Sequence, residues 1–109
     1  MLKIECEDIE LLDLIQKGRC TTNRLYKRLS SNATFKADLA KAIKKMKLVD
    51  TTSELKGIRS LNYEPLEGNL QGYSSVRIGF TSKYRLLFTE HDGGVLIKLI
   101  EVNEHYGDK

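Results

Sequence analysis

The chain has 109 residues, which is about the length of one compact domain. With 40% hydrophobic and 30% charged residues it can bury a core and keep a solvated surface, which excludes a disordered chain. Charges interrupt its first apolar stretch, which excludes both a signal peptide and a run of ~20 apolar residues that could span a bilayer. We therefore expect one cytoplasmic domain over residues 1–109.

The first elements are a strand and two helices. Residues 2–6 suit a short strand, and Asp8 can cap a helix that ends at Gly18. We expect that helix to carry its apolar stripe on Ile9, Leu12 and Ile15, each three residues from the next. A second helix begins near Thr22, and the Ser-Ser-Asn cluster at 30–32 ends it.

The clearest helix is predicted over residues 34–48, because its apolar residues recur at helical spacing on one face. These residues are Phe35, Leu39, Ala42, Ile43 and Met46. Thr51 and Glu54 then have the spacing of a capping box, which predicts a single helical turn before Gly57.

Residues 19–47 hold nine basic side chains against one acid, Asp38, although the net charge of the chain is only +3. The preceding eighteen residues are acidic instead. This segment could face a polyanion, or it could be an ordinary solvated helix face. The charge pattern leaves both interpretations open.

The second half reads as an irregular loop over 62–72, followed by strands. Val76, Ile78 and Phe80 alternate with polar positions, which predicts a strand with these three on the core side and Arg77 on the other. Residues 84–90 and 95–102 are two more strand-like runs, joined by a turn at 91–94. The sequence therefore predicts an α+β fold that contains a three-stranded antiparallel meander.

Several kinds of site are disfavoured. No histidine pair or carboxylate cluster has metal-ligand spacing, and no glycine-rich loop opens a helix, so we expect no metal or cofactor. The lone cysteines, Cys6 and Cys20, are expected to be reduced and partly buried, in preference to a catalytic role. Metal-free acid-base chemistry or plain binding remains. The side chains suited to it are Glu64, Arg77, Arg85, His105 and Tyr106, each of which taken alone is more often an ordinary surface residue.

These residues sit in a recognisable order. Glu64-Pro65-Leu66, a Gly-Tyr turn at 72–73, Arg77 on a strand, Tyr84-Arg85-Leu86 and a final Glu104-His105-Tyr106 follow one another. This order over residues 61–106 resembles the RelE-like toxins of type II toxin-antitoxin modules, in particular the YoeB and HigB branches. The resemblance implies an N-terminal strand and helices packed on a small, mainly antiparallel sheet.

The resemblance also implies a ribosome-dependent mRNA endoribonuclease that inhibits translation without a metal. In its chemistry Glu64 would act as general base, Arg77 would hold the phosphate, and His105 and Tyr106 would act at the leaving group and the neighbouring base. Further RNA contacts are expected from Arg85, as a secondary phosphate or structural contact, and from Lys83, Lys41, Lys44 and Lys45. The partners implied are a cognate antitoxin in a hetero-oligomer, the ribosome and mRNA, with no membrane.

Two alternatives stay open. A ParE-like member of the same fold would inhibit DNA gyrase by binding alone, and a degenerate member would only bind a partner. Glu67 stands where these toxins often carry a lysine, which favours weaker or redirected cleavage. Lys83, in a lengthened turn, is a candidate replacement for that cation.

Overall fold

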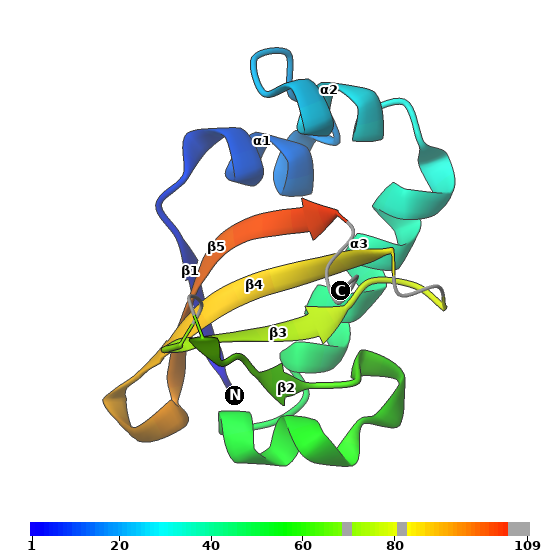
Figure 1. The fold of residues 1–109 in the computed structure, drawn as a ribbon. Helices are drawn as coiled ribbons and strands as arrows, with labels where there is room; N and C mark the ends of the chain where they lie inside the picture. The colour runs from blue at the N-terminus through cyan, green and yellow to red at the C-terminus, as the bar shows by residue number, and fades with distance from the viewer. Residues whose placement is uncertain (69–70, 81–82, 105–109) are drawn as a thin grey trace.

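The computed structural model describes residues 1–68, 71–80 and 83–104 and contains one five-stranded sheet in the order β1-β5-β4-β3-β2 (Figure 1). Its strands are β1 (Lys3–Cys6), β2 (Glu64–Pro65), β3 (Tyr73–Arg77), β4 (Tyr84–His91) and β5 (Leu96–Glu104). Strand β1 is parallel to β5, and every other pairing is antiparallel. The predicted α+β class, N-terminal strand and β3-β4-β5 meander are confirmed.

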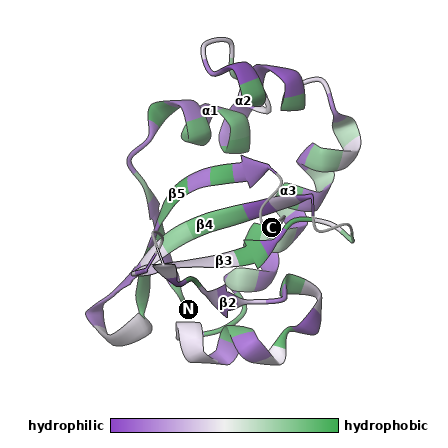
Figure 2. Ribbon diagram, in the orientation of Figure 1, coloured by the Kyte–Doolittle hydropathy of each residue, from purple (hydrophilic) through white to green (hydrophobic). Residues whose placement is uncertain are grey.

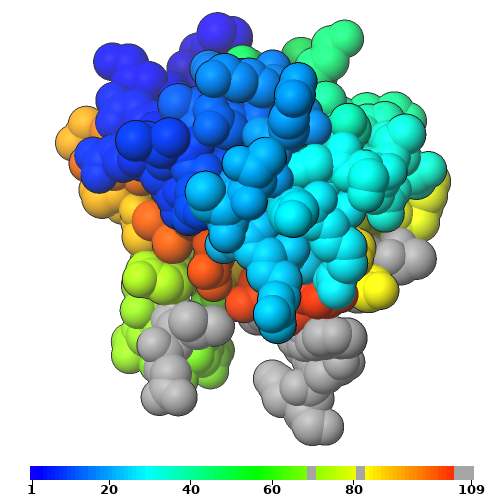
Figure 3. Space-filling view, turned by 90° about the horizontal axis from the view of Figure 1, so that it is seen from above, coloured from blue at the N-terminus to red at the C-terminus, as the bar shows by residue number. Residues whose placement is uncertain are grey.

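Three α-helices precede the meander: α1 (Ile9–Lys17), α2 (Arg24–Leu29) and α3 (Ala33–Met46). Each begins at a polar cap, because the side chains of Asp8, Asn23 and Asn32 accept hydrogen bonds from backbone N–H groups of the first turn. Short 3-10 helices follow at Thr52–Gly57, Arg59–Leu61 and Asp92–Gly94. Figure 3 shows α1 and α2 covering the top of the molecule, with the start of α3 beside them.

The core lies between the helices and one face of the sheet, where Leu86 and Phe88 of β4 are fully buried. Figure 2 shows the middle of β4 as hydrophobic, where Leu86, Leu87 and Phe88 lie. The expected core face of α3 is confirmed, because its five predicted apolar residues are all buried.

The apolar stripe expected for α1 is wrong. Leu11 and Leu14 are buried, whereas Ile9 is 73% exposed. This helix is apolar on two adjacent stripes, so the pattern alone could not tell which stripe faces the sheet. Packing against β1 and β5 selects the stripe of Leu11 and Leu14.

The position expected for Phe80 is also wrong. Val76 and Ile78 are buried as predicted, but Phe80 is 92% exposed. Strand β3 ends at Arg77, and Gly79 with a φ of 82° turns the chain, so the alternation of the strand no longer applies at Phe80.

Other expectations about the chain are confirmed. Cys6 and Cys20 are both free thiols, the first partly and the second fully buried. The Glu54 carboxylate accepts the backbone N–H of Thr51, as in a capping box. Within the described ranges, no helix has the length and apolar character needed to cross a bilayer.

Candidate functional site

An ion pair between Glu64 and Arg85 joins β2 to β4 across β3, the strand that lies between them. Arg85 Nη2 lies 3.5 Å from Glu64 Oε1, and the side chains are 2% and 47% exposed respectively. The guanidinium also donates from Nε to Ser75 Oγ at 2.8 Å and from Nη2 to the carbonyl of Asn62 at 2.6 Å. The half-exposed carboxylate of Glu64 is thus held by the buried guanidinium of Arg85.

The strand register explains this arrangement. Glu64 pairs with Ser75, and Arg77 pairs with Arg85, so these four side chains lie on one face of the sheet. Asn62 has a left-handed φ of 46°, which turns the chain before β2 and lets its carbonyl meet the guanidinium. The short strand β2 therefore places Glu64 over the middle of β3.

Arg77 lies at the edge of a hollow between α3 and the end of β3. The hollow has a volume of about 70 Å³, and Lys41 and Lys45 of α3 line it together with Arg77. Arg77 Nη2 approaches the carbonyl of Ser60 at 3.5 Å, and its buried Nε has no hydrogen-bond partner within the part of the chain that the structure describes. Three cationic side chains from two elements thus meet at one place.

Arg85, expected to be a secondary phosphate contact or a structural contact, lies in the interior of the protein. An arginine that is 2% exposed and surrounded by Ser75, Asn62 and Glu64 does not present its charge to a polyanion at the surface. Burying a guanidinium is costly unless it is paired and hydrogen-bonded, and this one is both. Of its two expected roles, the structural one fits.

The expected RNA-binding lysines lie in three different places. Lys41 and Lys45 line the hollow with Arg77, whereas Lys44 lies with Lys36 and Lys47 over a groove between α1 and α3. Lys83 immediately precedes β4, and its Nζ lies 3.7 Å from Glu104 Oε2. Of these four lysines, the structure places Lys41 and Lys45 together beside Arg77.

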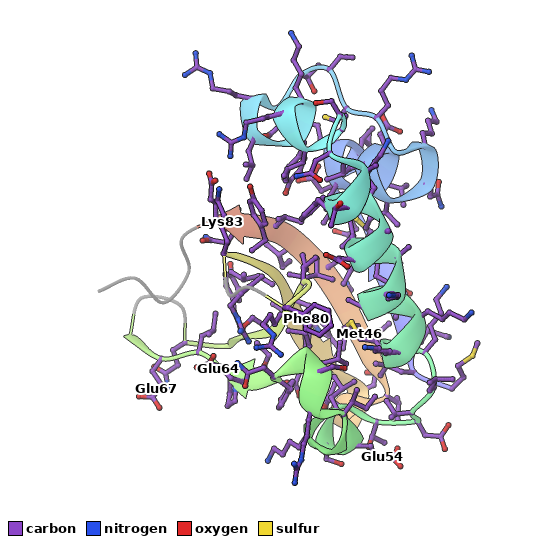
Figure 4. All side chains as sticks on the ribbon, turned by 90° about the vertical axis from the view of Figure 1, so that its right-hand side faces the viewer. Met46, Glu54, Glu64, Glu67, Phe80 and Lys83 are labelled. Atoms are coloured by element: carbon purple, nitrogen blue, oxygen red, sulfur yellow. The ribbon has the colours of Figure 1, made fainter. Side chains whose placement is uncertain are left out.

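Two of the four expected catalytic residues, His105 and Tyr106, lie outside the described residues, and their roles stay predictions. The last described residue, Glu104, pairs in register with Tyr84 and forms an ion pair with Arg28 at 2.7 Å. Glu67 is exposed and points away from the body of the protein in Figure 4.

Sequence reasoning missed Ser75 and Asn62, the neighbours that hold Arg85 in place. The position of Ser75, two residues before Arg77 on a strand, was a usable signal, because it puts both side chains on one face. Nothing local in the sequence indicated Asn62, since its contribution is a backbone carbonyl. The described residues contain no group of His, Cys, Asp or Glu suited to a metal.

The chain shares its fold with a YoeB/ParE toxin of known structure, with helices on one face of a mainly antiparallel sheet. A YoeB/ParE toxin from Agrobacterium tumefaciens superposes with a TM-score of 0.59 over 96% of this chain and 100% of its own, at 20% sequence identity.

A second solved structure is more distant. A conserved hypothetical protein from Helicobacter pylori covers 96% of each chain with 17% identity and a TM-score of 0.45, so the assignment of the fold rests on the first structure. No protein-family model and no curated protein matches the sequence.

Proposed function

We propose that this protein is the toxin of a type II toxin-antitoxin module and an endoribonuclease that cleaves mRNA on the ribosome without a metal. The observation that carries the proposal is the pair of Glu64 and Arg85. A carboxylate that is 47% exposed is fixed 3.5 Å from a buried guanidinium, beside a cluster of cations. A general base needs this combination of access and fixed orientation.

The proposed reaction breaks the bond between phosphorus and the 5′ oxygen of the next nucleotide. Glu64 takes the proton of a ribose 2′-OH, and the 2′ oxygen attacks the phosphorus atom. A cation, for which Arg77 is the candidate, stabilises the charge that develops on the phosphorane. His105 gives a proton to the departing 5′ oxygen, and Tyr106 stacks on the neighbouring base, as the family resemblance implies.

Arg85 acts in this scheme as a positioning residue. Its hydrogen bonds to Ser75 and Asn62 fix the guanidinium, and the guanidinium in turn orients the carboxylate of Glu64. Lys41 and Lys45 add positive charge at the hollow that Arg77 lines, which favours a phosphate backbone there.

The test is induction of the protein in a bacterial host, with primer extension on messages during growth arrest. Glu64→Gln should abolish the arrest and the new 5′ ends, because loss of a general base slows such reactions about 10²–10⁴-fold. Glu67→Gln is the matched control, since it removes an exposed carboxylate on the same loop and should leave arrest intact.

Folding must be separated from chemistry. Glu64→Gln removes the counter-charge of a buried guanidinium that keeps Ser75 and Asn62 as acceptors, so the free energy of unfolding should fall by about 1–3 kcal/mol and is measured beside the arrest. Arrest with intact messages and inhibited DNA supercoiling would contradict the nuclease proposal and favour the gyrase alternative.

The same proposal includes a cognate antitoxin that forms a hetero-oligomer with this chain. An acidic segment of that antitoxin would lie over the exposed basic side chains of α3 and offset their charge. Co-expression with the neighbouring open reading frame should yield a complex that suppresses arrest, and no complex from any such pair would contradict this part.

A further inference from the structure

The hollow beside α3 combines positive charge with an exposed aromatic ring. Lys41 and Lys45 of α3, Arg77 at the end of β3 and Ser60 line it, and Phe80 stands at its rim. Phe80 is the most exposed large apolar side chain among the described residues, at 92%. Figure 4 shows it on the side of the molecule that also carries Glu64.

The charges of the hollow favour an anion. Its three cations face one acid, Asp38, which also lines it. Lys45 Nζ binds Ser60 Oγ at 2.7 Å, which fixes one cation, and the Nε of Arg77 is buried with no partner in the described part of the chain. A buried donor without an acceptor is unfavourable, and an incoming phosphate oxygen would satisfy it.

The backbone holds Phe80 at this rim. Gly79 has a φ of 82°, a backbone conformation that favours glycine, and a Cβ at that position would lie 2.7 Å from Asp38 Oδ2, so the Asp38 side chain would have to move. The turn projects the ring of Phe80 into solvent next to the cations. A ring exposed beside basic side chains is the usual arrangement for binding single-stranded nucleic acid, because bases stack on the ring and phosphates meet the cations.

We propose that this hollow is a nucleotide subsite, which binds one phosphate of a single-stranded RNA through Arg77 and Lys41 while the adjacent base stacks on Phe80. This inference rests on the proposed function, because the subsite would hold the RNA whose cleavage is assigned to Glu64. Arg77 is two residues along β3 from Ser75, the partner of Glu64, so the subsite lies about 7 Å along the strand from the proposed base.

The test uses single-stranded RNA oligonucleotides with every ribose 2′-O-methylated, which blocks the attacking oxygen so that binding is measured without cleavage. Phe80→Leu keeps an apolar side chain but removes the ring, and it should weaken binding about 5- to 150-fold, since stacking contributes ~1–3 kcal/mol per base. Phe80→Tyr keeps the ring and should bind as the parent does.

Charge is tested by the salt dependence of the same binding. Lys41→Gln should make the slope of log K against log salt shallower by about 0.7, the value for one contact to a single-stranded phosphate. Lys47→Gln is the matched control, because Lys47 is an exposed lysine at the end of the same helix over the groove facing α1. That variant should keep the parent slope.

Oligonucleotides with one abasic nucleotide at successive positions locate the stacked base. The parent should bind the oligonucleotide more weakly when the abasic nucleotide stands at one particular position. Phe80→Leu should bind that oligonucleotide as it binds the intact one, because its stacking contact is already absent. Equal affinity of Phe80→Leu and the parent, or a parent that does not bind, would overturn the inference. Phe80→Leu that binds RNA normally but releases the antitoxin would also overturn it and assign the ring to a protein partner.

The two proposals fail in different ways. If new 5′ ends appear in cells but RNA binding does not depend on Phe80, the nuclease proposal stands and the subsite proposal is wrong. If RNA binding depends on Phe80 and Lys41 but the parent does not cleave messages, the subsite proposal stands and the nuclease proposal is wrong.

Discussion

At the scale of single residues, a second carboxylate, that of Glu90, accepts hydrogen bonds from several parts of the chain. Glu90 of β4 accepts hydrogen bonds from Thr52 at 2.7 Å, from Ser74 at 2.6 Å and from the hydroxyl of Tyr63. Burial raises the pKa of Glu90, but these hydrogen bonds outweigh it and hold that pKa below its ordinary value of 4.5. One carboxylate thus joins the 3-10 helix at Thr52–Gly57 and the residue before β2 to strands β3 and β4 of the sheet.

Glu90 should therefore contribute a pH-dependent part of the stability. Its lowered pKa in the folded state stabilises the protein above pH 4.5, and this contribution is lost as the pH falls through the folded pKa. Glu90→Gln should lower the free energy of unfolding near pH 7 by about 1–3 kcal/mol and flatten its decline in acid. Urea titrations from pH 7 to 3 measure both, with Glu67→Gln as the exposed control; parallel acid profiles would contradict the role of Glu90.

At the scale of elements, one hydroxyl fastens α2 to the sheet. The Tyr26 hydroxyl accepts the backbone N–H of Val102 in β5 at 3.0 Å, and Tyr26 is 3% exposed. Burial raises the pKa of Tyr26 to about 12, against a partial lowering by the hydrogen bond from Val102. Because α2 has only six residues, such tertiary contacts must stabilise it.

Tyr26→Phe should lower the free energy of unfolding by about 1–2 kcal/mol, because it leaves the N–H of Val102 without its acceptor. The parent should also lose stability as the pH rises from 10 to about 12, since the raised pKa favours the protonated folded state below that window. Tyr26→Phe should lack this loss. Denaturation at pH 8 to 12 tests both statements, and Tyr73→Phe serves as the control on a partly exposed ring.

At the scale of the whole molecule, the strand order places β4 and β5 inside the sheet and leaves β1 and β2 at its edges. Leu86, Leu87 and Phe88 of β4 are 0% exposed, whereas β2 has two residues and carries the exposed Pro65. Local opening requires the least energy where few contacts are lost. The proposed base therefore stands on a marginal edge strand, and the cation that holds it stands on a central strand.

Native-state hydrogen exchange should show this difference. We expect the backbone amides of Leu86 to Phe88 to exchange only through global unfolding, and the amide of Leu66, which bonds the carbonyl of Tyr73 beside β2, to exchange through local opening at least tenfold faster. Equal protection at both places would contradict the inference that β2 is marginal. Arg85→Lys, which loses the fork of hydrogen bonds, should raise exchange at Leu66 and not at Leu87.

The sequence by itself determined the elements whose signals are local. The cap at Asp8, the buried face of α3 and the strand-like run of β4 each depend on a few consecutive residues, so their positions could be predicted. The order of Glu64, Arg77 and Arg85 along the chain likewise suggested the family and its fold.

Only the tertiary structure decided which of these side chains meet. Arg85 proved to be the buried partner of Glu64, and Arg77 the neighbour of Lys41, because strand register and the approach of α3 join residues far apart in the sequence. The same holds for Ile9 and Phe80, whose exposure depends on the orientation of α1 and on one turn at Gly79. Side-chain periodicity fixes which residues share a face, but packing between elements fixes what that face contacts.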